Sequence, residues 1–92
     1  MNIEFDSAKN IKNIAERHLS FERAADFDFD TAVTKQDNRK RYPEARFVAL
    51  GFLETRLHVL CFTPVHNGIR VISFRKANRR EIRDYEQTPP TH

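Results

Sequence analysis

The architecture of this chain is set by residues 46–76, RFVALGFLETRLHVLCFTPVHNGIRVISFRK. The stretch contains three apolar runs typical of β-strands, at 46–53, 57–63 and 69–76. The connectors between them are short, and the second contains the turn pair Asn67-Gly68. Connectors of this length join antiparallel neighbours, because a parallel crossover needs about a dozen residues or more. The stretch therefore predicts a small antiparallel sheet.

The residues before the sheet predict an N-terminal helical hairpin. Asp6 is a suitable cap for a first helix over 7–17, and Ser20 is a suitable cap for a second, shorter one. Helical spacing predicts that the buried face of the first helix is formed by Ile11, Ile14 and Ala15. The same spacing predicts that the second helix buries Phe21, Ala24 and Ala25. The hairpin is expected to cover one face of the sheet.

The residues after the sheet predict a C-terminal helix over 78–87. Asn78 is its expected cap, Ile82 and Tyr85 share one face, and Thr88-Pro89-Pro90 ends it. The polar residues 35–45 are predicted to form a loop. One further short strand is possible just before it, near residues 31–35. The predicted order is α-α-β-β-β-α, an α+β fold in one domain spanning residues 1–92.

Composition excludes several classes of protein. The 92 residues are 39% hydrophobic and 32% charged, which is typical of a globular domain. One cysteine excludes a disulfide framework and a multi-cysteine zinc site, and two glycines exclude a glycine-rich phosphate loop. The apolar runs fall far short of the ~20 residues that span a bilayer, and no signal-peptide pattern is found. We therefore expect a cytoplasmic protein without a membrane segment.

Positive charge is concentrated in the second half of the chain. The whole chain carries 16 Lys and Arg against 13 Asp and Glu, a net charge of +3. Residues 35–92 hold twelve of the basic and six of the acidic side chains. A basic surface of this kind attracts polyanions such as nucleic acid. A solvated charged surface without a function is the alternative.

The densest chemical feature is the segment 70–86, RVISFRKANRREIRDYE. Its basic side chains are Arg70, Arg75, Lys76, Arg79, Arg80 and Arg83. Strict alternation along the strand predicts that Arg75 leaves on one face and that Arg70 and Lys76 leave on the other. Where the strand continues into the helix, several guanidinium groups can bind one phosphate. The alternative is that they form ion pairs with Glu81, Asp84 and Glu86.

Few side chains are candidates for proton transfer. Glu81 and Tyr85 lie one helical turn apart, so both can face the sheet. His58 is a candidate acid or base, but a partly buried strand histidine with a satisfied hydrogen bond is the favoured interpretation. The scattered histidines lack metal-ligand spacing, so neither a metal site nor a cofactor is expected. Tyr42, beside three basic residues, is a candidate for stacking on a base.

A recognisable pattern of residues extends over nearly the whole chain. Its first half comprises Phe5, Asp6, Lys9, Asn13, Ser20, Phe21, Glu22 and Ala24. Its second half comprises Arg46, Leu50-Gly51, Leu57, Val59, Thr63, Arg70-Val71-Ile72-Ser73, Arg75-Lys76-Ala77, Arg80-Glu81 and Tyr85. With these residues the chain resembles the BrnT-type ribonuclease toxins of bacterial type II toxin–antitoxin systems. It departs from the family at Glu16-Arg17-His18, where Lys-His-Gly is usual, and at Phe74, where a small residue is usual.

The resemblance implies a RelE-like α+β fold and RNA cleavage that needs no metal. It also implies neutralisation by a cognate, BrnA-like antitoxin in a hetero-oligomer. As a mechanism we hypothesise attack of an RNA 2′-OH on the adjacent phosphate, with the charge stabilised by Arg70, Arg75 and Arg79 and by Arg46 from the neighbouring strand. Glu81 or Tyr85 would transfer protons. The expected RNA contacts are Lys76, Arg80, Arg83 and Tyr42.

Two other functions remain open from the sequence. The basic surface around residues 70–83 is equally compatible with a module that binds nucleic acid without cutting it. It is also compatible with a module that binds an acidic segment of a partner protein. Loss of cleavage with retained RNA affinity in arginine variants would favour the enzyme.

Overall fold

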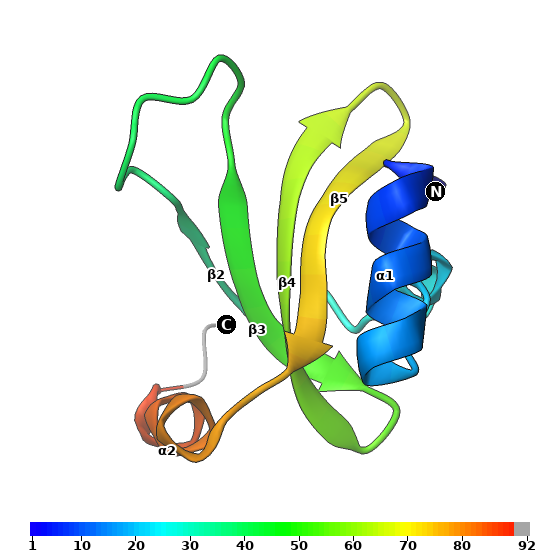
Figure 1. Cartoon of the computed structure of the whole chain (residues 1–92). Coiled ribbons are helices and arrows are strands. Elements are labelled where there is room, and N and C mark those ends of the chain that lie inside the picture. Colours follow the sequence, from blue (N-terminus) through cyan, green and yellow to red (C-terminus); the bar gives the residue numbers. More distant parts are fainter. Residues whose placement is uncertain (90–92) are drawn as a thin grey trace.

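The computed structural model describes residues 1–89 and contains one five-stranded sheet (Figure 1). The strand order is β1-β5-β4-β3-β2. The strands are β1 (Asn2–Phe5), β2 (Val33–Gln36), β3 (Phe47–Leu53), β4 (Arg56–Val65) and β5 (Gly68–Lys76). The helices are α1 (Ser7–Arg17), the 3-10 helix η1 (Phe21–Asp26) and α2 (Arg79–Gln87). The three predicted strands, their antiparallel pairing and the C-terminal helix are confirmed.

The predicted order of elements is wrong at the N-terminus. The chain begins with a strand, β1, which pairs in parallel with β5 and makes the sheet mixed. Residues 7–26 do not form the predicted helical hairpin, because Ser20 caps a 3-10 helix of six residues in place of a second α-helix. The short strand expected near 31–35 is present as β2. The observed fold is a β-rich α+β fold with one helix near each end of the chain, not α-α-β-β-β-α.

Strand β1 was not predicted because it is four residues long and its pairing partner is more than sixty residues away. Gly68 makes this pairing sterically feasible. A Cβ atom at Gly68 would overlap the backbone of Asn2, its register partner in β1. The turn pair Asn67-Gly68 thus connects β4 to β5, and the missing Cβ of its glycine leaves the space that the backbone of β1 occupies.

The buried face of α1 differs from the predicted one. Ile11 and Ile14 are 67% and 43% exposed, whereas Asn13 is 4% exposed. The Asn13 amide nitrogen donates to the backbone oxygens of Leu19 (2.9 Å) and Phe74 (3.0 Å). Asn10 faces the same way, and its Oδ1 accepts from the backbone N–H of Phe21 at 2.7 Å. The helix packs through amides because it lies over backbone groups that need hydrogen-bond partners.

Replacing Asn13 by alanine is expected to lower the free energy of unfolding by about 1–3 kcal/mol, because two buried carbonyl oxygens lose their donor. Ile11→Ala is the matched control on the same helix, and its effect should stay within about 0.5 kcal/mol. Urea unfolding followed by circular dichroism measures both. Equal effects, or a larger effect at Ile11, would contradict the observed orientation of α1.

The two faces of the sheet carry separate apolar clusters. On one face, Leu19 and η1 pack on β3, β4 and β5, and the fully buried members of this larger core include Leu60 and Phe74. On the other face, Ile82 and Tyr85 of α2 pack against Leu57, Val59 and neighbouring side chains. Helix α2 lies at the end of the sheet where β5 ends (Figure 1). On the sheet face that carries α2, the half farther from α2 is not covered by any helix among residues 1–89.

A β-bulge in β5 changes which side chains share a face. Phe62 pairs with Val71 and Cys61 with Ser73, so Ile72 is an extra residue without a partner. Strict alternation predicted Arg70 and Arg75 on opposite faces, and that prediction is wrong. The extra residue reverses the alternation, so both arginines lie on the face of α2. Lys76, paired with His58, points to the other face.

Within residues 1–89, no helix has the length and apolar character needed to cross a membrane.

Candidate nucleic-acid interface

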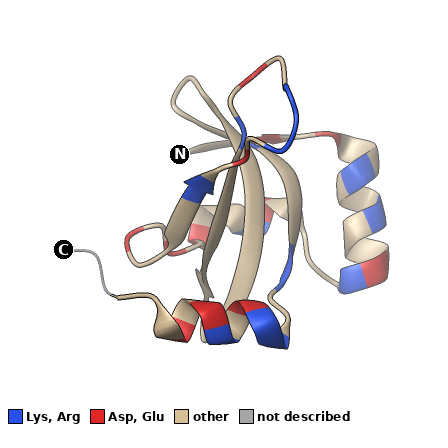
Figure 2. Cartoon of the chain, turned by 90° about the vertical axis from the view of Figure 1, so that its left-hand side faces the viewer, with Lys and Arg blue, Asp and Glu red and all other residues tan. Residues whose placement is uncertain are grey.

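The uncovered half of the α2 side of the sheet has basic side chains around an apolar floor. Val48, Cys61 and Ile72 form the floor. Around it lie Lys35 on β2, Arg46 just before β3, and Arg70 and Arg75 on β5. We call these seven residues the open face. The basic segments of α2 and of the 37–46 loop lie at opposite ends of it (Figure 2).

Arg75 is held on the open face by Glu81, an ion pair that the sequence offered as the alternative to phosphate binding by the arginines of this segment. Nη1 and Nη2 of Arg75 lie 2.8 and 2.9 Å from the two carboxylate oxygens of Glu81, and Nη1 also donates to the Lys76 carbonyl at 3.3 Å. A guanidinium has five N–H donors, so Nε–H and one Nη2–H remain for another acceptor. Arg75 is thus oriented by its partner and can still bind a phosphate.

The same pair sets the charge of Glu81. Hydrogen bonds from Arg75 lower the pKa of the Glu81 carboxyl, and the backbone N–H of Asn78 (2.9 Å) adds to the effect against the opposing influence of burial. The pKa of Arg75 is raised by the same hydrogen bonds. Glu81 also closes the capping box of α2 with Asn78, so it links the start of the helix to β5.

Arg46 is stacked on Tyr42 at the other end of the open face. Its guanidinium carbon lies 3.9 Å from the centre of the Tyr42 ring, a cation–π contact. Its Nε is buried and has no hydrogen-bond partner within residues 1–89. Next to it, Tyr42, Thr63, Arg70 and Ile72 line a hollow of about 190 Å³. Tyr42, predicted to stack on a base, is half-buried and has Arg46 on one face of its ring.

Asp37 organises the loop that carries Tyr42. Its side chain is 2% exposed and accepts two hydrogen bonds of 2.9 Å from the Arg39 guanidinium and one of 3.3 Å from the Tyr42 hydroxyl. Its backbone N–H donates to the Arg46 carbonyl at 2.7 Å. These bonds, those from Arg39 above all, hold the pKa of Asp37 well below its usual range. Sequence reasoning did not identify Asp37, because nothing marks it within a polar loop.

The depressed pKa of Asp37 predicts a pH-dependent stability. The unfolded carboxyl has a pKa of about 3.9, above the folded value, so Asp37 stabilises the fold fully above that pH and progressively less as the pH falls below it. Asp37→Asn should therefore lower the Tm at pH 7, and the difference from the parent should shrink between pH 4 and pH 2, as measured by thermal unfolding across that range. Asp30→Asn, at an exposed position, is the control. A Tm difference independent of pH would contradict this role.

Arg70 lies on the open face, but two carboxylates share its charge. Its Nη2 is 3.2 Å from Glu4 of β1 and its Nη1 is 3.1 Å from Glu44 of the loop. Arg70 therefore ties the edge strand and the loop to β5. In this arrangement it has fewer donors free for a phosphate than Arg75.

The remaining predicted residues are dispersed. Arg79, Arg80 and Arg83 are exposed on α2, and no carboxylate within residues 1–89 is in ion-pair distance of them. The Tyr85 hydroxyl donates to the Thr31 carbonyl at 3.0 Å, and its ring packs edge-on against Phe52. These contacts attach α2 to the rest of the molecule.

His58 lies on the face opposite to Arg75, so the two side chains do not meet. It is 4% exposed, and its Nδ1 lies 2.8 Å from the Arg56 carbonyl, as the favoured interpretation of the sequence required. The sequence analysis did not identify Lys35 as a residue of the open face. Its spacing of two from Val33 in a strand could have placed both side chains on the same face of the sheet. Within residues 1–89, no three side chains of His, Cys, Asp or Glu are grouped as metal ligands.

Comparison with known families gives one finding. A family model described as the ribonuclease toxin BrnT of type II toxin–antitoxin systems matches residues 5–81. The matched region contains the whole open face and ends at Glu81. No curated protein matches the chain.

Proposed function

Because the chain belongs to the BrnT family of ribonuclease toxins of type II toxin–antitoxin systems, we propose that it is an endoribonuclease whose RNA site is the open face. The observation that carries the proposal is the Arg75–Glu81 pair. It presents an oriented guanidinium with free N–H donors on the half of the α2 side of the sheet that no helix within residues 1–89 covers, with Arg46 and Lys35 elsewhere on the same surface. A phosphodiester is the ligand that such a group of cations favours.

The proposed reaction uses the RNA's own 2′-OH as the nucleophile and needs no metal. The 2′ oxygen bonds to the adjacent phosphorus, the bond from phosphorus to the 5′ oxygen breaks, and a 2′,3′-cyclic phosphate and a 5′-hydroxyl result. The Glu81 carboxyl is ionised at neutral pH, where an ordinary carboxyl is already ionised and Arg75 lowers its pKa further, so it is in the state that accepts the 2′-OH proton. The leaving 5′ oxygen takes up the proton that the 2′-OH released.

Charge that develops on the cleaved phosphate is stabilised by Arg75, and Arg46, at the other end of the open face, binds a neighbouring phosphate of the same strand. Arg79, at the first position of α2, is exposed like Arg80 and Arg83, and these three side chains bind neighbouring phosphates of the strand. Arg70 is assigned to holding Glu4 and Glu44, and Tyr85 to anchoring α2 through Thr31. Tyr42 orients Arg46 through the cation–π contact of its ring with the guanidinium.

The test is incubation of the purified chain with a fluorescently labelled RNA in the presence of EDTA. Cleavage is expected, with cyclic phosphate at the new 3′ ends. An oligonucleotide with 2′-deoxy sugars throughout should remain intact, because it lacks the nucleophile. Binding of RNA without cleavage would identify a non-catalytic RNA-binding module. Absence of both RNA cleavage and RNA binding would favour the alternative function, in which the basic surface binds an acidic segment of a partner protein.

The toxins of type II systems pair with an antitoxin protein. For this chain we propose a BrnA-like antitoxin, with an acidic segment suited to the basic open face, and action in the cytoplasm on cellular RNA.

A further inference from the structure

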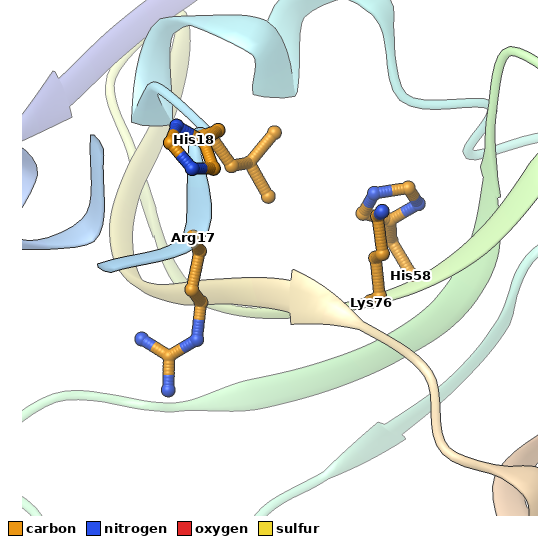
Figure 3. A pocket seen from close by; sticks show the side chains of 5 residues that line it. Arg17, His18, His58 and Lys76 are labelled. Atoms are coloured by element: carbon orange, nitrogen blue, oxygen red, sulfur yellow. The ribbon is translucent and has the colours of Figure 1, made fainter. Parts of the chain in front are cut away.

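A second basic hollow lies on the face of the sheet opposite to the open face. It has a volume of about 380 Å³ and is lined by Arg17, His18, Leu19, His58 and Lys76 (Figure 3). Arg17 and His18 come from the end of α1, His58 from β4 and Lys76 from the last position of β5. We call it the α1-side pocket. Its size is within the range of small-ligand sites, sufficient for a phosphate with its sugar.

The polar groups of the α1-side pocket are nitrogen-bearing side chains, and no carboxylate from residues 1–89 lines it. His58 and Lys76 are register partners on neighbouring strands, and Figure 3 shows the Lys76 amine beside the His58 ring. His58 Nδ1 is engaged by the Arg56 carbonyl, which leaves Nε2 without a hydrogen-bond partner within residues 1–89. Lys76 likewise has no ion-pair partner there.

The end of α1 completes the pocket. His18 adopts the left-handed conformation (φ 56°) that ends the helix, and its ring lies across the pocket from His58 (Figure 3). A glycine in its place would adopt this conformation more easily, so the imidazole is held there at a conformational cost. The Arg17 guanidinium donates to Asn13 Oδ1 at 2.8 Å, at the rim. Arg17 and Lys76 bring two positive charges to the lining with no carboxylate from residues 1–89 among them, and a bound anion would offset their repulsion.

We propose that the α1-side pocket binds a phosphate group of the RNA chain other than the one that is cleaved. This inference rests on the proposed function, since it supplies a second contact for the same substrate. Arg75 and Lys76 are adjacent in β5 and point to opposite faces. An RNA strand that crosses the end of β5 therefore meets Arg75 on one side and Lys76, with the pocket, on the other.

The surroundings of His58 fit an anion site. Burial lowers its pKa against the opposing hydrogen bond to the Arg56 carbonyl, and the positive charges of Arg56, Lys76 and Arg23 lower it further. Arg17 and His18, from the end of α1, line the same pocket, so its charged and titratable lining groups are basic. A bound phosphate adds the missing negative charge, so the pKa of His58 should rise when the pocket is occupied.

The first measurement is NMR of the histidine ring protons in the full chain. The two probes are inorganic phosphate and an uncleavable 2′-O-methyl oligonucleotide. Both should move the His58 and His18 signals and raise the pKa of His58, and the oligonucleotide should do so at the lower concentration. Signals that respond to inorganic phosphate alone would overturn RNA as the source, and signals that respond to neither would overturn the pocket.

The second measurement is oligonucleotide affinity by fluorescence anisotropy at several salt concentrations. Lys76→Met should weaken binding about tenfold and reduce the salt slope by about 0.7, the value for one phosphate of a single strand. Lys76→Arg should restore most of the affinity. Lys12→Met, which removes the same charge from an exposed position on α1, is the control. Equal affinities of the Lys76→Met and Lys12→Met variants would overturn the proposal.

These readouts separate this inference from the nuclease proposal. Both measurements use uncleaved RNA. If the chain does not cut RNA but shows the His58 shift and the Lys76 effect, the pocket proposal stands and the nuclease proposal is wrong. If the parent chain cuts RNA and the Lys76→Met variant binds RNA with unchanged affinity, the nuclease proposal stands and the pocket proposal is wrong.

Discussion

Replacing Arg75 by alanine is expected to lower kcat/KM for RNA cleavage by about 10²- to 10³-fold, the usual effect of removing one donor that stabilises a developing anion. Arg75 is the arginine that Glu81 orients on the open face with donors to spare. The fold should survive, because both side chains of the pair are partly exposed, 39% and 26%. Single-turnover cleavage of labelled RNA measures the first effect, and circular dichroism the second.

Two further variants make this result specific. Arg80→Ala removes the same side chain from an exposed position on α2, and its cleavage rate should fall by less than about tenfold, as for one backbone contact. Arg75→Lys keeps the charge but loses the planar fork, so it should recover only a small part of the activity. An Arg75→Ala variant that is folded and cleaves RNA at the parental rate would remove Arg75 from the site. Unfolding of that variant would show that the residue is structural.

Replacing Phe74 by alanine is expected to lower the free energy of unfolding by about 3–5 kcal/mol. Phe74 has 0% exposure and packs edge-on against Phe27, with ring centres 6.1 Å apart. It also lies against the His58 ring in a tilted arrangement, with ring centres 5.5 Å apart. Truncation removes this contact and leaves a cavity between η1 and the sheet, which has little room to collapse. Equilibrium unfolding in urea measures the loss.

Phe47→Ala is the control for Phe74. Phe47 is at the start of β3, is half-buried and stacks on Phe62, so its removal should cost clearly less. A similar cost for both would mean that the core is not centred on β5. The sequence resemblance led us to expect a small residue at position 74. The place of Phe74 in the larger core means that its ring fills space beneath η1 and does not lie on the open face.

Part of the candidate site was predictable because its residues are close in sequence. Glu81 follows Arg75 by six positions, across a strand end and a helix cap that the sequence marks with Asn78. The pair therefore follows from local structure. Arg70 was predicted to act beside Arg75, but its partners Glu4 and Glu44 come from β1 and a loop that are distant in sequence. No local pattern identifies such partners.

Local patterns were sufficient for the three central strands, their antiparallel order, the C-terminal helix and the basic second half of the chain. Each depends on hydrophobic period, turn residues or charge within a short window. Three features depended on long-range pairing. They are the parallel edge strand β1, the rotation of α1 that buries Asn13 and exposes Ile11, and the bulge at Ile72. An edge strand, a helix orientation and a strand register are selected by the hydrogen bonds and packing that distant segments offer one another, and those energies become available once the chain has folded.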